Sequence, residues 1–341
     1  MIALAAVLTA GVYRAAPAPR STPHVVGDRT IPLTFPSDVR WLDDTRVLVT
    51  DTDRGIATIA ISANDAGIQW LPDWPQPTGP GSRYFHLAVS SQYIVAGDFA
   101  FRLRWQARET AAHGTISCEF IADVDVHDKQ ILISGLRRDA AGSLGSDGAT
   151  AWIGRIDSGG ETLRPILPFR SRKAIEDCAG FGLGVVRFLG SGSFVVVPGS
   201  EPGVYLFGND AKLQRVWQTD ALDLSVNCNL SRDEQIVLAQ KPVARAQWIN
   251  RHAIVDDVLD TEAGPALIVR KLAAGTTRWE IVRLGGTLPS TEDLPVTSPS
   301  PWAHVRAAMR GRRAVLLIAD RLPGRDDGAA PRLVVVEWSR R

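Results

Sequence analysis

The residues best suited to chemistry in this sequence are polar side chains that occupy one position of a repeated strand pattern. That position, just before the inner strand of each repeat, holds Asp38, His86, Asp123 or Asp125, Asn227 or Asn229, and His304. Carboxylate and amide oxygens suit Ca²⁺, whereas two imidazoles with a carboxylate suit a transition metal. The alternative is that these groups satisfy one another by hydrogen bonds over a water-filled channel.

The elements that must position these residues are tight hairpins that recur along the chain. Each has an apolar strand, two to five turn-type residues and a second, very apolar strand. The six hairpins begin near Trp41, Val89, Val126, Phe188, Leu230 and Met309. Their spacing is roughly forty residues where no insertion intervenes, which is typical of four-stranded propeller blades. The pattern predicts an all-β, six-bladed propeller with very little helix, as a single domain over residues 21–341.

Two repeats are longer than the rest, and the last one is incomplete. Arg137–Gly148 and Lys241–Gly264 interrupt their blades as predicted surface excursions, the second with a short helix around Arg251–Leu259. The final repeat has three strands and an unpaired edge, which is a liability in a sheet. We expect Thr30–Phe35, near the N-terminus, to supply the missing strand and close the ring.

Composition limits the possible partners of the chain. The net charge is +1, from 38 basic and 37 acidic residues spread along 341 positions, so no basic stripe predicts nucleic-acid binding. After the N-terminus, no apolar stretch is long enough to cross a bilayer. We expect a monomer without a transmembrane span, and no cofactor other than a divalent metal at the channel mouth.

The N-terminal segment 1–20 resembles a secretory leader or a short anchor. Ile2–Val12 is apolar and Ala15–Pro19 offers small residues for cleavage, although a basic segment before the apolar run is missing. This pattern predicts a periplasmic or secreted protein. In such a compartment Cys178 and Cys228 could form a disulfide, and the alternative is three buried thiols that include Cys118.

The opening of the first repeat resembles the six-bladed propellers of the NHL-repeat and related bacterial families. The resemblance lies in Asp38-Val39-x-Trp41-Leu42-Asp43-Asp44 and in the strand Val47–Asp51. It implies a rigid disc whose loops carry the function. Lactonases of the senescence-marker and gluconolactonase type also use a six-bladed disc with a metal site at its mouth. This chain departs from them, with Pro36-Ser37-Asp38 in place of their Glu-Gly-Pro opening.

Together these observations predict an exported, non-catalytic binding scaffold. It would recognise a protein, peptide or glycan through the inter-blade loops and the channel mouth near Asp38, His86, Asn227 and His304. The alternative is a metal-dependent hydrolase with its site at the same mouth. The acidic pairs Glu176-Asp177 and Asp256-Asp257 suit general acid–base chemistry, but we expect them to be solvated charges on exposed loops.

Overall fold

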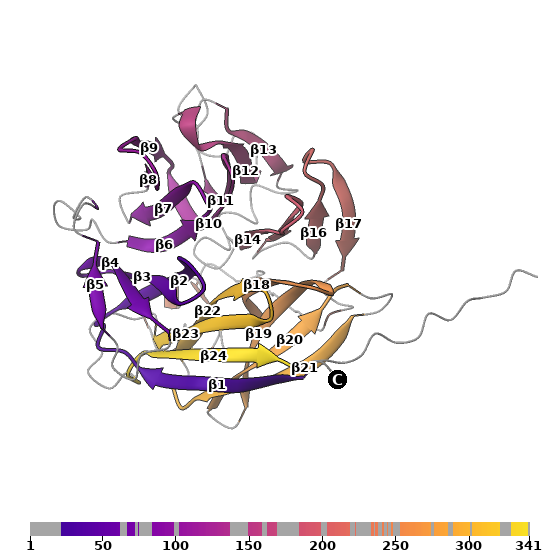
Figure 1. Ribbon diagram of the computed structural model, residues 1–341. Helices are drawn as coiled ribbons and strands as arrows, with labels where there is room; N and C mark the ends of the chain where they lie inside the picture. The colour runs from indigo at the N-terminus through magenta and orange to yellow at the C-terminus, as the bar shows by residue number, and fades with distance from the viewer. Residues whose placement is uncertain are drawn as a thin grey trace, which may run out of the picture.

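The chain forms six four-stranded antiparallel sheets around a central axis, which is a six-bladed β-propeller (Figure 1). This computed structural model describes residues 22–61, 67–71, 74, 84–98, 102–136, 149–158, 162–168, 184–198, 203–218, 253–273, 276–285, 289–300, 302–320 and 329–339, with isolated residues between 222 and 247. The predicted all-β, six-bladed fold is confirmed. Among the described residues, no helix has the length and apolar character needed to cross a membrane.

The first three blades each use four consecutive strands, from the channel outward. Blade 1 contains β2 (Pro36–Trp41), β3 (Arg46–Asp51), β4 (Gly55–Ala60) and β5 (Ile68–Trp70). Blade 2 contains β6 (Tyr84–Val89), β7 (Tyr93–Asp98), β8 (Arg102–Ala107) and β9 (His113–Ser117). Blade 3 contains β10 (Phe120–His127), β11 (Gln130–Leu136), β12 (Ala149–Arg155) and β13 (Arg164–Pro168), with the 3₁₀ turn η1 (Ile156–Ser158) after β12.

The last three blades repeat this order until the ring closes. Blade 4 contains β14 (Val185–Phe188), β15 (Phe194–Val197), β16 (Val204–Phe207) and β17 (Leu213–Trp217). Blade 5 contains β18 (Ile254–Thr261), β19 (Gly264–Ala273), β20 (Thr276–Arg283) and β21 (Ser290–Ser298). Blade 6 contains β22 (Ala303–Arg310), β23 (Arg313–Asp320), β24 (Arg332–Trp338) and, as its outer strand, β1 (Pro23–Thr30).

The ring is closed by an N-terminal strand, as predicted, but that strand lies upstream of the predicted segment. β1 pairs antiparallel with β24, from Pro23 opposite Trp338 to Thr30 opposite Arg332. In Figure 1 the indigo strand β1 accordingly lies beside the yellow strand β24. The closing strand therefore ends where the prediction placed its beginning.

Residues 31–35 instead carry the chain from blade 6 into blade 1. Ile31 and Leu33 are buried in the core between these two blades. The backbone N–H groups of Thr34 and Phe35 donate to Oδ2 of Asp51, at 2.9 and 3.1 Å. Because Asp51 satisfies these donors, the segment forms a buried crossover and needs no neighbouring strand.

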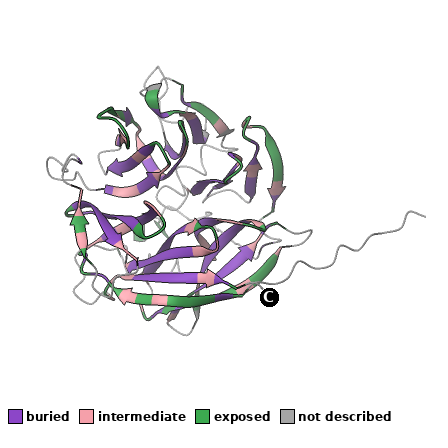
Figure 2. Cartoon of the chain, in the orientation of Figure 1, coloured by how far each residue is buried: buried purple, intermediate pink, exposed green. Residues whose placement is uncertain are grey.

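The hydrophobic core consists of six clusters, each at the joint between two neighbouring blades. Alternating apolar residues of each strand face the next blade; Val39, Val47 and Val49, for example, pack against blade 6. Figure 2 shows burial concentrated in the inner and middle strands, whereas the outer strands β1 and β17 are largely exposed. The stability of the disc therefore depends on contacts between blades as well as within them.

The two ends of the propeller differ in the length of their connections. We call the end at which the inner strands begin the mouth face, and the opposite end the rear face. All connections of more than ten residues join strand ends at the mouth face; they are residues 71–83, 137–148, 169–184, 218–253 and 321–331. Connections at the rear face have eight residues or fewer. Long connections between the strands of a rigid scaffold are where binding proteins concentrate their variable surface.

Candidate functional site: an ionic network in the central channel

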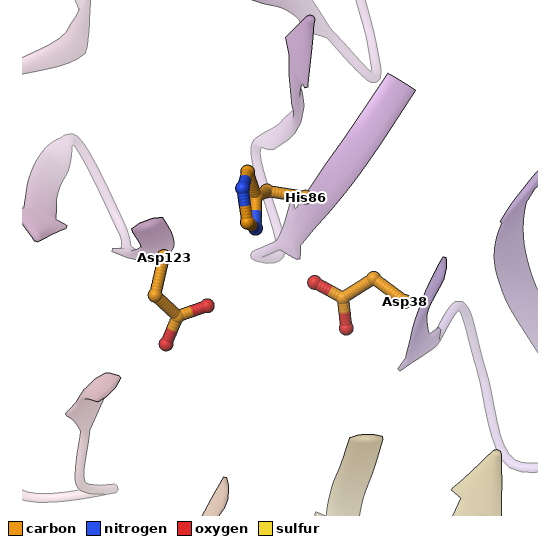
Figure 3. A group of neighbouring side chains, drawn as sticks. All are labelled: Asp38, His86 and Asp123. Carbon is orange, nitrogen blue, oxygen red and sulfur yellow. The ribbon is translucent and has the colours of Figure 1, made fainter. Parts of the chain in front are cut away.

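The inner strands bring three of the predicted residues together near the mouth of the channel. Asp38 on β2, His86 on β6 and Asp123 on β10 each offer a ligand atom within 4.8 Å of the others. Figure 3 shows the three side chains extending from separate strands toward a common centre. Asp38 and Asp123 are fully buried, while His86 is only partly buried.

The remaining predicted residues do not all join this group. His304 lies on β22 and is buried, at 2% exposure. Asn227 and Asn229 lie outside the described residues, as do Cys178 and Cys228 of the predicted disulfide. Cys118 is half-buried.

The prediction for blade 5 is wrong, and the error concerns residues of the channel. Leu230–Ala239 was expected to form its first hairpin, but the described part of that segment, including Ile236 and Val237, is helical. The inner hairpin is formed by β18 and β19, so the helix expected around Arg251–Leu259 is a strand from Ile254 onward. The apolar run Ile236–Ala239 has the composition of the second strand of a blade, which is why the sequence predicted a strand there. In the structure Ile236 and Val237 are 44% and 40% exposed, so they do not belong to the core.

Asp256 and Asp257 therefore occupy the channel and are not the solvated loop pair that we expected. Asp257 is fully buried and Asp256 is 5% exposed. The inner strand shifts register between Val255 and Asp257, and this irregularity turns both carboxylates toward blade 6.

Aspartates of blades 1, 3 and 5 fasten these blades to blades 2, 4 and 6. An inner strand has a sheet partner on its outer side only, so part of its N–H groups must find acceptors elsewhere. The carboxylate Oδ2 atoms accept these protons, in the order Asp38 from Leu87 (2.8 Å), Asp123 from Val186 (3.0 Å), Asp125 from Phe188 (2.7 Å), Asp256 from Val305 (3.1 Å) and Asp257 from Ala307 (2.8 Å). Each of these carboxylates therefore holds two adjoining blades together.

Three buried arginines connect blades through the channel, and two of them, Arg40 and Arg306, reach blades that are not their neighbours in the ring. Arg40, Arg187 and Arg306 come from the inner strands of blades 1, 4 and 6 and are at most 7% exposed. Their guanidinium groups surround Asp123 of blade 3, with Nη atoms 3.5 Å (Arg187 and Arg306) and 4.0 Å (Arg40) from its carboxylate oxygens. The centre of the disc is therefore spanned by charged side chains.

Two closer ion pairs complete the network. Arg40 Nη1 donates to Oδ1 of Asp38 at 2.7 Å, within blade 1. Arg187 of blade 4 donates to Oδ1 of Asp257 in blade 5. Because both partners in each pair are buried, removal of one partner leaves the other without its closest counter-charge.

The same network moves the pKa values of its carboxyl groups in opposite directions. Burial alone would raise the pKa of Asp123, but attraction to Arg187, Arg306 and Arg40 outweighs burial and holds it at about 2. For Asp38 burial is the stronger effect and raises the pKa, against the pull of Arg40. Burial likewise raises the pKa of Asp125.

We expect the contribution of Asp123 to stability to disappear in acid. Its pKa is lower in the folded protein than in the unfolded chain, where an aspartate titrates near 3.9. The contribution is therefore present above pH 4 and is lost as the pH falls toward about 2. Urea unfolding of the wild type and of Asp123→Asn, measured from pH 6 to pH 2, should show a difference in free energy of unfolding that shrinks toward the acid end. A difference that stays constant would contradict the assigned pKa.

The surroundings of the Asp38, His86 and Asp123 group oppose a divalent cation. Both carboxylate oxygens of Asp38 already accept hydrogen bonds, from Arg40, Val39 and Leu87. Among the four carboxylate oxygens of the group, only Oδ1 of Asp123 lacks a hydrogen bond, and it lies 3.5 Å from Arg306 and 4.0 Å from Arg40. A metal ion bound there would stand beside two buried guanidinium groups, where charge repulsion opposes binding.

Sequence reasoning missed the residues that dominate the channel. Arg40 and Arg306 lie two residues after the predicted Asp38 and His304, which places each pair on the same side of a strand. This spacing is a signal that could have indicated them. Nothing comparable pointed to Arg187, because its blade offers no polar residue two positions earlier.

The fold and the network define a six-bladed β-propeller with a closed, ionically cross-linked centre. No protein-family model matches the sequence, and no curated protein matches it either. Among solved structures, a streptogramin B lyase is similar over 93% of this chain and 98% of its own, with 12% identity and a TM-score of 0.52. A catalytically inactive virginiamycin B lyase from Staphylococcus aureus with quinupristin is similar over 93% and 100%, with 10% identity and a TM-score of 0.50. At such identities the likeness concerns the fold alone.

Proposed function

We propose that this protein is a non-catalytic scaffold that binds a protein, peptide or glycan partner at the mouth face. One observation carries the proposal: every connection of more than ten residues joins strand ends at that face. The resemblance of the first repeat to NHL-type propellers, whose loops carry function, supports the same role.

The ionic network argues against chemistry inside the channel. The carboxylates that could act as acid, base or metal ligand accept backbone N–H groups of the adjoining blade, and arginines neutralise them. A general acid or base must reach the proton that it transfers, and the carboxyl groups of Asp38, Asp123 and Asp257 are completely buried.

A second candidate, a metal-dependent hydrolase, is favoured by the convergence of Asp38, His86 and Asp123 on one centre. Metal analysis of the purified protein separates the two candidates. The scaffold predicts substoichiometric divalent metal whether or not His86 is replaced by alanine. A stoichiometric ion that is lost in His86→Ala would favour the hydrolase.

The scaffold is tested directly by selection from a displayed random-peptide library and by a glycan array, with the full chain immobilised. We expect ligands whose binding is lost when connection 137–148 or 321–328 is replaced by a short Gly-Ser linker. The matched control replaces rear-face residues 108–112 by a Gly-Ser linker of equal length and should retain binding. The proposal would be contradicted if no ligand were found, or if binding were lost only in the variant with the rear-face replacement.

A further inference from the structure

A cavity of about 240 Å³ opens at the mouth face, where blade 6 meets the outer strand of blade 5. Five strand ends border it: the last residues of β21, β23 and β1 and the first residues of β22 and β24. Its lining comprises Thr30, Ser298, Pro299, Ala303, Ile318, Ala319, Asp320, Ala329, Ala330 and Arg332. The cavity thus belongs to the face that carries the long connections, and it lies apart from the ionic network of the channel.

Small apolar side chains create this hollow. Ala303, Ile318 and Ala319 are buried, at 1%, 4% and 4% exposure. Ala329 is half-buried and Ala330, at the rim, is exposed. Ala303 and Ile318 pack on the side of blade 6 that faces blade 5, whereas Ala319, the next residue of the strand, packs toward blade 1. The cavity therefore presents the methyl group of Ala303 and the side chain of Ile318 to whatever enters it.

The charged residues of the lining are engaged with the protein itself. Arg332 donates from Nη2 to the carbonyl oxygen of Thr297 at 2.7 Å, and its Nη1 lies 3.2 Å from Oδ2 of Asp28. Asp320 accepts the backbone N–H of Ala329 at 3.1 Å. The lining therefore has no excess of one charge that would select an ionic ligand, and its remaining surface is mainly apolar.

Size restricts the occupant further. Pockets for drug-sized molecules usually have volumes of about 300–1,000 Å³, so this cavity is too small for such a ligand and suits a single large side chain. Protein interfaces commonly anchor one apolar side chain in a pocket of this kind. Resting on the proposed function, we infer that this cavity is the anchor pocket for a large, uncharged apolar side chain of a polypeptide partner.

The occupant can be probed without knowledge of the partner. The probes are N-acetyl-L-leucinamide and N-acetyl-L-phenylalaninamide, with N-acetyl-L-lysinamide as the charged comparison. NMR of the full chain with labelled alanine methyl groups should show shifts at Ala303 and Ala329 with the uncharged probes. We expect binding of the lysine derivative to be at least about tenfold weaker, because its ammonium group would have to be desolvated.

Two variants make this test decisive. Ala330→Phe fills the cavity from its exposed rim and should abolish the methyl shifts, whereas Ala111→Phe, at an exposed rear-face position, should preserve them. Equal binding of the charged probe, shifts only at other alanines, or unchanged binding to Ala330→Phe would overturn the inference. If peptides selected on the wild type bind Ala330→Phe equally well but need the mouth-face connections, the pocket assignment fails while the proposed function stands.

Discussion

Replacement of Asp257 by alanine should lower the free energy of unfolding by about 3–5 kcal/mol, the usual effect of breaking a buried ion pair. Asp257 accepts hydrogen bonds from the N–H groups of Val258 and Ala307, both at 2.8 Å, and is paired with Arg187. The substitution leaves these buried donors without their acceptor and Arg187 without its closest counter-charge. Urea unfolding followed by tryptophan fluorescence measures the effect.

Two control variants separate the network from a general effect of losing an aspartate. Asp293→Ala, on an exposed position of β21, should change stability by no more than about 0.5 kcal/mol. Asp257→Asn keeps the shape of the side chain but removes its charge, so it should fall between the wild type and Asp257→Ala. If Asp257→Ala is as mild as Asp293→Ala, the carboxylate does not hold blades 5 and 6 together.

Deletion of the closing strand should lower the free energy of unfolding by at least as much as Asp257→Ala. β1 and β24 are paired at seven residue positions. At roughly 0.5–1.5 kcal/mol per hydrogen bond, the loss of this ladder costs on the order of 5 kcal/mol. The deletion also uncovers a strand edge that can pair with another chain, so we expect aggregation as well. A chain that begins at Ile31 is compared with one that begins at Thr22, by thermal unfolding and light scattering.

A synthetic peptide that covers residues 22–30 provides the rescue experiment. Added in excess to the chain that begins at Ile31, it should restore part of the lost thermal stability, because it can occupy the free edge of β24. The account would be contradicted if the truncated chain unfolded at the same temperature as the longer chain and if the peptide left that temperature unchanged. The ring would then not need the closing strand.

The sequence predicts most of the architecture because hairpins are local. Alternating apolar residues around short turns, such as Trp41–Asp51, are determined by neighbours within a dozen positions. The closing strand lacks this signal: His24, Val25, Val26 and Asp28 are all exposed, so no apolar alternation marks β1 as a strand. Its partner, β24, lies at the other end of the chain.

The candidate site was predictable only in part, for a similar reason. The repeat pattern indicated Asp38, His86, Asp123 and His304 just before the inner strands, and the structure places them within the first residues of these strands. The partner of Arg187 is Asp257, seventy positions further along the chain, and only the packing of blade 4 against blade 5 brings them together. An aspartate pair such as Asp256-Asp257 also has the composition of a solvated turn, and its burial depends on a register shift in β18.

The central claim is that buried charges in the channel hold the blades together, and a double-mutant cycle between Arg187 and Asp257 tests it most directly. The free energies of unfolding of the wild type, Arg187→Gln, Asp257→Asn and the double variant are measured under one set of conditions. We predict a coupling energy of at least about 2 kcal/mol, because either single substitution leaves one buried side chain without its closest partner. Additive effects, with a coupling below about 0.5 kcal/mol, would contradict the claim.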